Sequence, residues 1–265
     1  MINLVVALPA EARPLIKHYD LIHKQTHSAF PLYRNEGMAL VVSGPGKVSA
    51  AAATAWLAGL AGESRRAAWL NIGIAGHATH DIGTCLLVNR ITDRASNRSW
   101  YPPQVHDLDI AANRLLCTDA PEYDYGSDAL YDMEASGFYP AACRFSSGEL
   151  AQCFKIVSDN RQQSTAQVNA KLCTQLLYGQ LQEIDRVVGA LLGLQQQYSQ
   201  RHSTHPDHER MLGHWHFSVS QQHRLTRLLQ RWTTLAPGRS AWSNTLNKLK
   251  TASAVLQHLE RQLDV

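Results

Sequence analysis

Short runs of apolar and β-branched residues alternate with helical patterns along the first 160 residues, and this alternation constrains the fold more than any other feature. Several runs are apolar at successive positions, as strands covered by helices on both faces are. The alternation therefore predicts an α/β layered fold. The predicted strands are "NLVVAL" (3–8), "MALVVSG" (38–44), "AWLNIGI" (68–74), "TCLLVNRI" (84–91), "RLLCTD" (114–119) and "CFKIVSD" (153–159).

The rest of the chain reads differently. Helical patterns run over 166–200, around Leu225 to Trp232 and over 246–263, and no strand is predicted there. This part is rich in glutamine and carries the chain's excess of basic over acidic residues. We therefore predict two modules, an α/β domain at 1–165 and an all-helical extension at 166–265.

Composition narrows the class of protein. The 265 residues are 45% hydrophobic, which is enough for a substantial core, yet no apolar run reaches the roughly 18 residues of a membrane helix. The five cysteines are scattered without a CxxC pair, as in proteins with reduced thiols. The start "MINLVVALP" has neither a basic leader nor a small-residue cleavage site. These features predict a cytoplasmic protein without a membrane segment.

Three acidic residues follow or flank predicted strands. Glu11 comes after the first strand, Glu134 lies in the apolar stretch "LYDMEASGFYPAA", where a buried helix is expected to begin, and Asp159 ends the last strand. Each alone fits a helix cap or a surface acid. Ligand-binding groups of open α/β sheets gather at the carboxyl ends of strands, and an unpartnered buried carboxylate is costly. Together the three acids predict a site.

Five motifs occur along the first part of the chain in this order: "VVALPAEARPL", "VVSGPGKVSAAAA", "LNIGIAGHATHDIGTCLLVNRITD", "LYDMEASGFYPAA" and "FKIVSDN". They resemble those of the nucleoside phosphorylase-I family, most closely its methylthioadenosine/S-adenosylhomocysteine nucleosidase branch. The resemblance covers about residues 1–160 and leaves the helical part unexplained. It implies a three-layer α/β/α domain with a central mixed sheet, no metal or organic cofactor, a nucleoside substrate and a homo-oligomer.

The resemblance also implies roles for individual residues. Glu11 activates the attacking water, Glu134 holds the ribose hydroxyls with Met133 against the sugar, and Asp159, beside Ser158, protonates the departing purine. A carboxylate near the ribose suits this chemistry, because breaking an N-glycosidic bond develops positive charge on the sugar. The further substrate-binding positions that it implies are Gly44, Gly73, Ile74, Ala75, Gly76, Asp119, Ala120 and Lys155.

The sequence departs from the family pattern in several places. Ile74 replaces a serine, Lys155 replaces an arginine, and Pro121 stands where an aromatic stacks on the base. Trp100 and Tyr101 are alternative stacking residues or loop anchors. The segment between "NRITDR" and "RLLCTDAP" is shorter than usual, so we expect the C-terminal helices to replace its packing near the open side of the pocket.

The expected reaction is hydrolysis of a purine nucleoside, a 5′-modified adenosine in particular. "LNIGIAG" lacks the arginine that phosphorylases use for phosphate, which favours water as the nucleophile. Arg13, Arg34 and Arg94 remain candidate phosphate ligands, so a phosphorylase is the first alternative. A catalytically weak nucleoside sensor is the second. The Gln-rich basic helices lack a nucleic-acid motif, and the His-rich stretch 201–217 lacks metal-ligand spacing, so neither nucleic acid nor a metal is expected.

Overall fold

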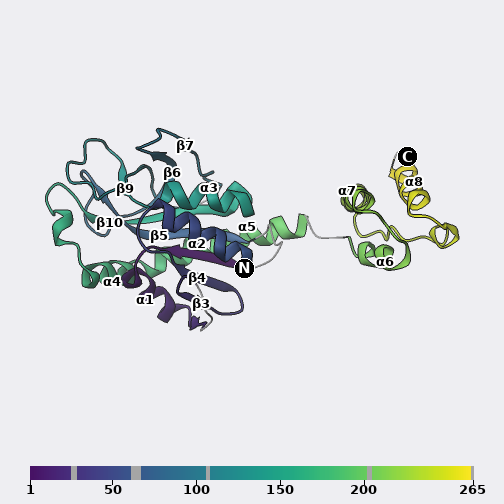
Figure 1. Cartoon of the computed structure of the whole chain (residues 1–265), viewed down its shortest axis with the longest axis horizontal. Coiled ribbons are helices and arrows are strands. Elements are labelled where there is room, and N and C mark those ends of the chain that lie inside the picture. Colours follow the sequence, from purple (N-terminus) through teal and green to yellow (C-terminus); the bar gives the residue numbers. More distant parts are fainter. Residues whose placement is uncertain (25–28, 61–66, 106–107, 202–204, 264–265) are drawn as a thin grey trace. The chain divides into compact units, whose positions relative to one another are not determined.

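The computed structural model describes residues 1–24, 29–60, 67–105, 108–201 and 205–263. The chain forms two compact units, Met1–Gln197 and Tyr198–Val265. We call the first the body and the second the helical unit (Figure 1). The body contains every strand of the described residues, and the helical unit is made of helices and loops. Each unit is described by itself.

The body is built on one mixed sheet of ten strands. β1 pairs in parallel with β4 on one side and β5 on the other, and β5 continues in parallel with β10. The predicted α/β fold with a mixed sheet is confirmed. The strands are β1 (Ile2–Val6), β2 (Ile22–His23), β3 (Leu32–Arg34), β4 (Met38–Val42), β5 (Ala68–His77), β6 (Cys85–Asp93), β7 (Ser99–Trp100), β8 (Ala112–Cys117), β9 (Leu130–Asp132) and β10 (Ala151–Asp159).

Part of this sheet closes on itself. β10 pairs with both β5 and β6, β6 pairs with β8, β8 with β9, and β9 returns to β5. These five strands therefore form a ring, and β1 to β4 extend from it as an open sheet. The sequence predicts the long strands of this ring, but a three-residue strand such as β9 carries too little pattern to be recognised.

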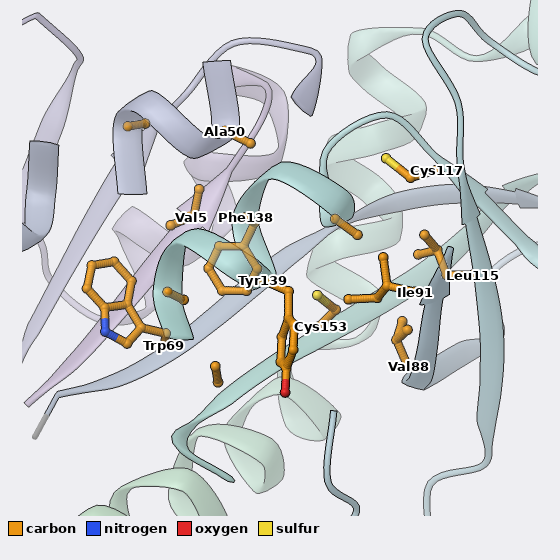
Figure 2. Packing of buried hydrophobic residues seen from close by; sticks show 14 of the residues in the cluster. Val5, Ala50, Trp69, Val88, Ile91, Leu115, Cys117, Phe138, Tyr139 and Cys153 are labelled. Atoms are coloured by element: carbon orange, nitrogen blue, oxygen red, sulfur yellow. The ribbon is translucent and has the colours of Figure 1, made fainter. Parts of the chain in front are cut away.

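One face of the sheet is covered by α2 (Lys47–Leu60) and α3 (Ala135–Phe145). Alternate strand residues point to this side and pack against the two helices, as the two-residue period of a strand requires. Figure 2 shows this packing around Trp69 and Phe138, both 1% exposed or less. Gly137 is essential to it, because a Cβ there would overlap the carbonyl oxygen of Lys47.

The opposite face is covered by α1 (Pro9–His18), α4 (Ala170–Gly179) and α5 (Leu181–Arg201). Leu4, Leu40 and Ile72 of the strands pack here with Leu177 and Ile184 of α4 and α5. The body is thus a helix–sheet–helix arrangement (Figure 1).

This second layer corrects the predicted division of the chain. The sequence places the boundary at residues 165 and 166, but the contacts place it between residues 197 and 198. The reason is that α4 and most of α5 supply buried side chains to the core of the body. The extension proper is therefore the helical unit alone.

The stretch around Glu134 also departs from expectation. It was expected to begin a helix, but Leu130–Asp132 form strand β9, and α3 begins only at Ala135. Glu134 is the residue immediately before α3, and Asp132 accepts the N–H of Ala135 at 3.0 Å. Both acids consequently lie at a strand-to-helix junction, where their side chains face the end of the sheet.

The helical unit has a core of its own. α7 (Val219–Leu235) and α8 (Ala252–Leu263) pack together with α6 (Asp207–His214), a helix within the stretch expected to be a polar loop. Leu225, Leu229 and Leu256 are fully or almost fully buried in this core. α7 ends just before "APG", whereas the pattern over 246–263 predicts a longer helix than α8, because Leu246 and Leu249 lie before its first residue.

None of the described helices is long and apolar enough to span a membrane. No group of three or more His, Cys, Asp or Glu side chains within the described ranges could hold a metal ion.

Candidate active site

A cavity of about 220 Å³ opens at the carboxyl ends of β1, β5 and β10. All three predicted acids, Glu11, Glu134 and Asp159, line it, and each is at least nine-tenths buried. Its lining consists of Ala7, Leu8, Glu11, Pro45, Ile74, Ala75, Gly76, Thr118, Pro121, Glu122, Tyr125, Tyr131, Asp132, Met133, Glu134, Ser158, Asp159, Thr165 and Val168.

Glu11 is fixed by backbone donors. One carboxylate oxygen accepts the N–H groups of Ala7 at 3.0 Å and Leu8 at 2.9 Å, and the other accepts that of Ile74 at 3.0 Å. Burial raises the pKa of Glu11, although these N–H groups oppose the shift. Gly73 leaves the space for this carboxylate, since a Cβ there would lie 2.9 Å from it. The arrangement suits a base that takes a proton from water.

Glu134 is held by the glycine-rich turn after β4. Its carboxylate accepts the N–H of Gly46 at 2.8 Å, and Gly46 has a φ of 93°, a conformation that favours glycine. Burial, together with the charge of the neighbouring Asp132, raises the pKa of Glu134 to about 7. This side chain is therefore poised to change charge near neutral pH.

A buried ion pair lies behind these acids. The Lys155 ammonium group is 2.8 Å from Asp132, and both residues are almost completely buried. Burial alone would lower the pKa of Lys155, but the charges of Asp132 and Glu134 raise it overall. The other oxygen of Asp132 is buried without a hydrogen-bond partner among the described residues, and Asp132 lines the cavity.

Asp159 is surrounded by hydroxyl groups. Ser158 donates to one of its oxygens, and Tyr125 and Thr165 both donate to the other, Thr165 at 2.7 Å. Burial and the hydrogen bond to Asp159 raise the pKa of Tyr125, so this phenol remains a donor. Asp159 thus faces the cavity with a defined orientation, as a proton donor to a bound molecule needs.

The predicted substrate-binding positions divide into two groups. Met133, Ile74, Ala75, Gly76 and Ser158 line the cavity. The others are absent from its lining: Gly44, Gly73, Asp119, Ala120 and Lys155.

Those in the second group have other surroundings. Gly73 and Lys155 lie beneath Glu11 and Asp132, behind the wall of the cavity. The side chain of Asp119 is 63% exposed and pairs with Lys47 at 2.7 Å, and the carbonyl of Ala120 accepts the hydroxyl of Thr118. Their neighbours Thr118, Pro121 and Glu122 take the positions on the wall. The resemblance therefore indicated the correct segment. The residues of this segment that line the cavity lie one or two positions from Asp119 and Ala120 in the sequence.

The aromatic residues of the site were not recognised from the sequence. Trp100 and Tyr101 were the suggested stacking residues, but neither lines the cavity, and Tyr101 is 64% exposed. Tyr125 and Tyr131 supply the aromatic wall, with ring centroids 5.6 Å apart. The loop residues Tyr125 and Thr165 carry no spacing signal, since only the tertiary fold brings them to Asp159.

A second cavity, of about 340 Å³, adjoins the first between α1 and α4. The two share Leu8 and Val168 in their walls. The remaining lining residues of the second cavity are Pro9, Ala10, Arg13, Asn169, Ala170 and Cys173. Val168 and Asn169 belong to the stretch that was expected to lie near the pocket, at its N-terminal end before α4 begins.

The candidate phosphate ligands lie elsewhere. Within the described part of the chain no arginine lines the first cavity. Arg13 belongs to the second cavity, Arg94 pairs with Glu122, and Arg34 lies in β3. His77 caps the turn after β5, because its ring accepts the N–H groups of Thr79 and His80.

The fold of the body is similar to that of solved methylthioadenosine nucleosidases. Among solved structures, the 5′-methylthioadenosine nucleosidase of Arabidopsis thaliana is similar with a TM-score of 0.62 and 17% identity, over 72% of this chain and 95% of that one.

Two bacterial structures are also similar. The corresponding nucleosidase of Helicobacter pylori gives a TM-score of 0.59 at 12% identity, over 71% of this chain and 97% of that one. Futalosine hydrolase from the same organism gives 0.53 at 13% identity, over 69% and 97%. No family model matches the sequence, and neither does any curated protein.

Proposed function

We propose that this protein hydrolyses the N-glycosidic bond of a purine nucleoside. The observation that carries the proposal is the convergence of three buried carboxylates, Glu11, Glu134 and Asp159, on one cavity at the carboxyl ends of the strands. The similarity of the fold to solved nucleosidases supports it, since those proteins act on nucleosides.

Each carboxylate has a role in this proposal. The bond between C1′ and the base nitrogen breaks, and its electron pair leaves with the base. Asp159 gives a proton to the base, so that the base departs neutral. Glu11 takes a proton from a water molecule as that water adds to C1′, and free base and free sugar result. Glu134, ionised, binds the ribose hydroxyls and stabilises the positive charge that develops on the sugar.

Water is the proposed nucleophile. An arginine would be expected near C1′ if phosphate attacked, because its planar fork matches phosphate oxygens. The described lining of the first cavity contains none, and the nearest buried cation, Lys155, is already paired with Asp132. Glu11 instead offers a carboxylate, which activates water and repels phosphate.

The adjoining cavity supports a 5′-modified adenosine as the substrate. A nucleoside with its base at Asp159 and its ribose at Glu134 needs only the first cavity. The second cavity, reached past Leu8 and Val168, leaves room for a substituent on the 5′ carbon. By the same resemblance we propose a homo-oligomer, which light scattering of the purified protein would check. From the scattered, unpaired pattern of cysteines we propose a cytoplasmic location.

The test is a nucleoside panel assayed with and without inorganic phosphate. We expect free base and free sugar from adenosines with 5′-thioether substituents, at rates independent of phosphate. Asp159→Asn should lower kcat about 100- to 10,000-fold while binding persists. Strict dependence on phosphate with formation of sugar 1-phosphate would establish a phosphorylase, and tight binding without turnover would establish a sensor.

A further inference from the structure

One set of contacts at the site has no role in the mechanism above. The hydroxyls of Tyr125 and Thr165 both donate to Oδ2 of Asp159, and their oxygens lie 2.7 Å from each other. Ser158 donates to the other oxygen, Oδ1. Asp159 is therefore hydrogen-bonded by hydroxyls at both oxygens, and two of the three come from loop residues outside β10.

Tyr125 is held firmly in this position. Its side chain is 2% exposed, and its ring packs edge-on against Tyr131 at an interplanar angle of 74°. Arg161 donates to its backbone carbonyl at 2.8 Å. Its φ of 44° is unfavourable for a residue other than glycine, so these contacts must outweigh that strain.

The neighbouring strand makes room for the tyrosine. A Cβ at Gly76 would lie 2.6 Å from the ring of Tyr125 and 2.8 Å from Oδ2 of Asp159. Thr165 lies at the start of η2 (Thr165–Gln167), and its hydroxyl oxygen is 3.1 Å from the carbonyl oxygen of Glu122, a longer contact than the one to Asp159. Three elements thus hold the two hydroxyls at Asp159: Gly76 of β5 leaves space for the tyrosine ring, η2 carries Thr165, and the loop before β9 carries Tyr125.

We propose that Tyr125 and Thr165 are positioning residues that promote protonation of the leaving base by acting through Asp159. The inference rests on the proposed hydrolysis. As Asp159 gives up its proton, it gains negative charge, and hydrogen bonds to an ionised acceptor are roughly twice as strong as bonds between neutral groups. The two hydroxyls therefore stabilise the transition state more than the ground state.

This role predicts a dependence on the leaving group. A purine must be protonated to depart, so its hydrolysis should need the hydroxyls. 4-Nitrophenolate leaves as a stable anion, so hydrolysis of 4-nitrophenyl β-D-ribofuranoside at the same site should not need them. A residue that merely supports the fold would affect both substrates alike.

The experiment measures kcat and KM for both substrates in five variants of the full-length chain alongside the parent. Tyr125→Phe and Thr165→Val each remove one hydroxyl, the double variant removes both, and Thr165→Ser retains it. Tyr123→Phe is the matched control, because Tyr123 lies in the same loop but is 63% exposed. Circular dichroism confirms that each variant is folded.

We expect Tyr125→Phe to lower kcat for the nucleoside about 10- to 100-fold, with KM little changed. Its kcat for the nitrophenyl riboside should stay within about twofold of the parent, and Thr165→Ser should retain most of what Thr165→Val loses. Equal losses on both substrates, or no loss on the nucleoside, would overturn the inference.

Two further outcomes are distinguishable. If Tyr125→Phe does not fold, the comparison of Thr165→Val with Thr165→Ser decides the inference by the same criterion. If the parent protein hydrolyses neither substrate, the proposed function itself fails, which differs from an active parent whose variants show no dependence on the leaving group.

Discussion

At the scale of single residues, the main feature of the site is the set of donors and charges that stabilise its buried carboxylates. Glu11 has three backbone donors, Asp159 has three hydroxyl donors, and Asp132 has a lysine. Glu134 has a single N–H from Gly46 and the negative charge of Asp132 nearby. It is therefore the acid of the four whose charge is most poorly compensated by direct donors.

The raised pKa of Glu134, about 7 instead of 4.5, predicts how stability depends on pH. The folded state holds the proton more tightly than the unfolded state, so this residue's contribution is fully present below pH 4.5 and is lost as pH rises through 7. Because a glutamine does not titrate, the free energy of unfolding of Glu134→Gln should not fall in this way. Raising the pH from 5 to 8 should therefore shift the difference between variant and parent by about 2 kcal/mol in favour of the variant.

Urea denaturation of both proteins at the two pH values measures this difference. Glu36→Gln, at an exposed glutamate, is the control and should show no such dependence. Because the ionised form binds the ribose in the proposed mechanism, activity of the parent should rise through the same pH range. A stability difference independent of pH would contradict the shifted pKa.

At the scale of elements, the close approach of α2 and α3 sets the position of Glu134. Gly137 sits in the first turn of α3 against the backbone of Lys47, just after the turn that contains Gly46. Any side chain at 137 would push the two helices apart and separate Glu134 from its donor.

Gly137→Ala should destabilise the protein by about 1–3 kcal/mol or more, because the methyl group would meet backbone atoms that cannot move aside. Gly189→Ala is the matched control, since Gly189 is an exposed helical residue with nothing near its Cβ position. It should be stabilised by up to about 1 kcal/mol. Thermal melts of the two variants measure both effects. Equal shifts of Tm would show that the contact between Gly137 and the backbone of Lys47 does not affect stability.

The second cavity, formed by α1 and α4, has one charged residue in its lining, Arg13. An acidic group at the end of a 5′ substituent should therefore be preferred over a neutral group of the same shape. We expect a nucleoside with a carboxylate-ended 5′-thioether to exceed its carboxamide counterpart about two- to fivefold in kcat/KM, the range for an exposed ion pair.

Arg13→Gln should abolish this preference. Lys17→Gln should leave it intact, because it removes the same charge one turn further along α1, outside the described lining. Competition assays with a series of spacer lengths measure the ratio. A preference that persists in Arg13→Gln would show that the acidic group lies elsewhere.

How much of the structure could be predicted from the sequence depends on the length of each element's local pattern. Long apolar strands such as β1, β5 and β10 have a strong pattern, so they were predicted, and their ends located Glu11 and Asp159. Strand β9 is too short to show a period, so Asp132 and Glu134 were expected at a helix. Tyr125 and Thr165 meet Asp159 only through folding of distant segments, and no local pattern records that.

At the scale of the whole molecule, the chain is longer than the fold requires. About seven-tenths of it covers nearly the whole of each similar nucleosidase. The helical unit has an apolar core of its own, including Leu225, Leu229 and Leu256. We therefore expect that the body can be separated from the helical unit by truncation at the boundary, residue 197.

A variant that ends at residue 197 should stay soluble and keep the hydrolytic activity, because it retains all the described residues of the site. A variant that ends at residue 165 should aggregate, because Leu177, Ile184 and Leu191 would no longer cover the sheet. Burial of each such side chain is worth roughly 1.5–3 kcal/mol. Size-exclusion chromatography and the base-release assay compare the two. Loss of activity in the longer variant would show that the helical unit contributes to the site.

The closed ring of strands determines when the protein can fold during its synthesis. β10 is the last strand in the chain, yet it joins β5 to β6 and carries Asp159 at its end. During synthesis the N-terminal elements emerge first, but they remain an open sheet with unpaired edges until residue 159 is available. Pairing β10 with a strand some 80 residues earlier makes this step slow. The candidate site therefore cannot assemble before β10 is in place, and a nascent chain that stops before β10 leaves unpaired strand edges where the cavity would form.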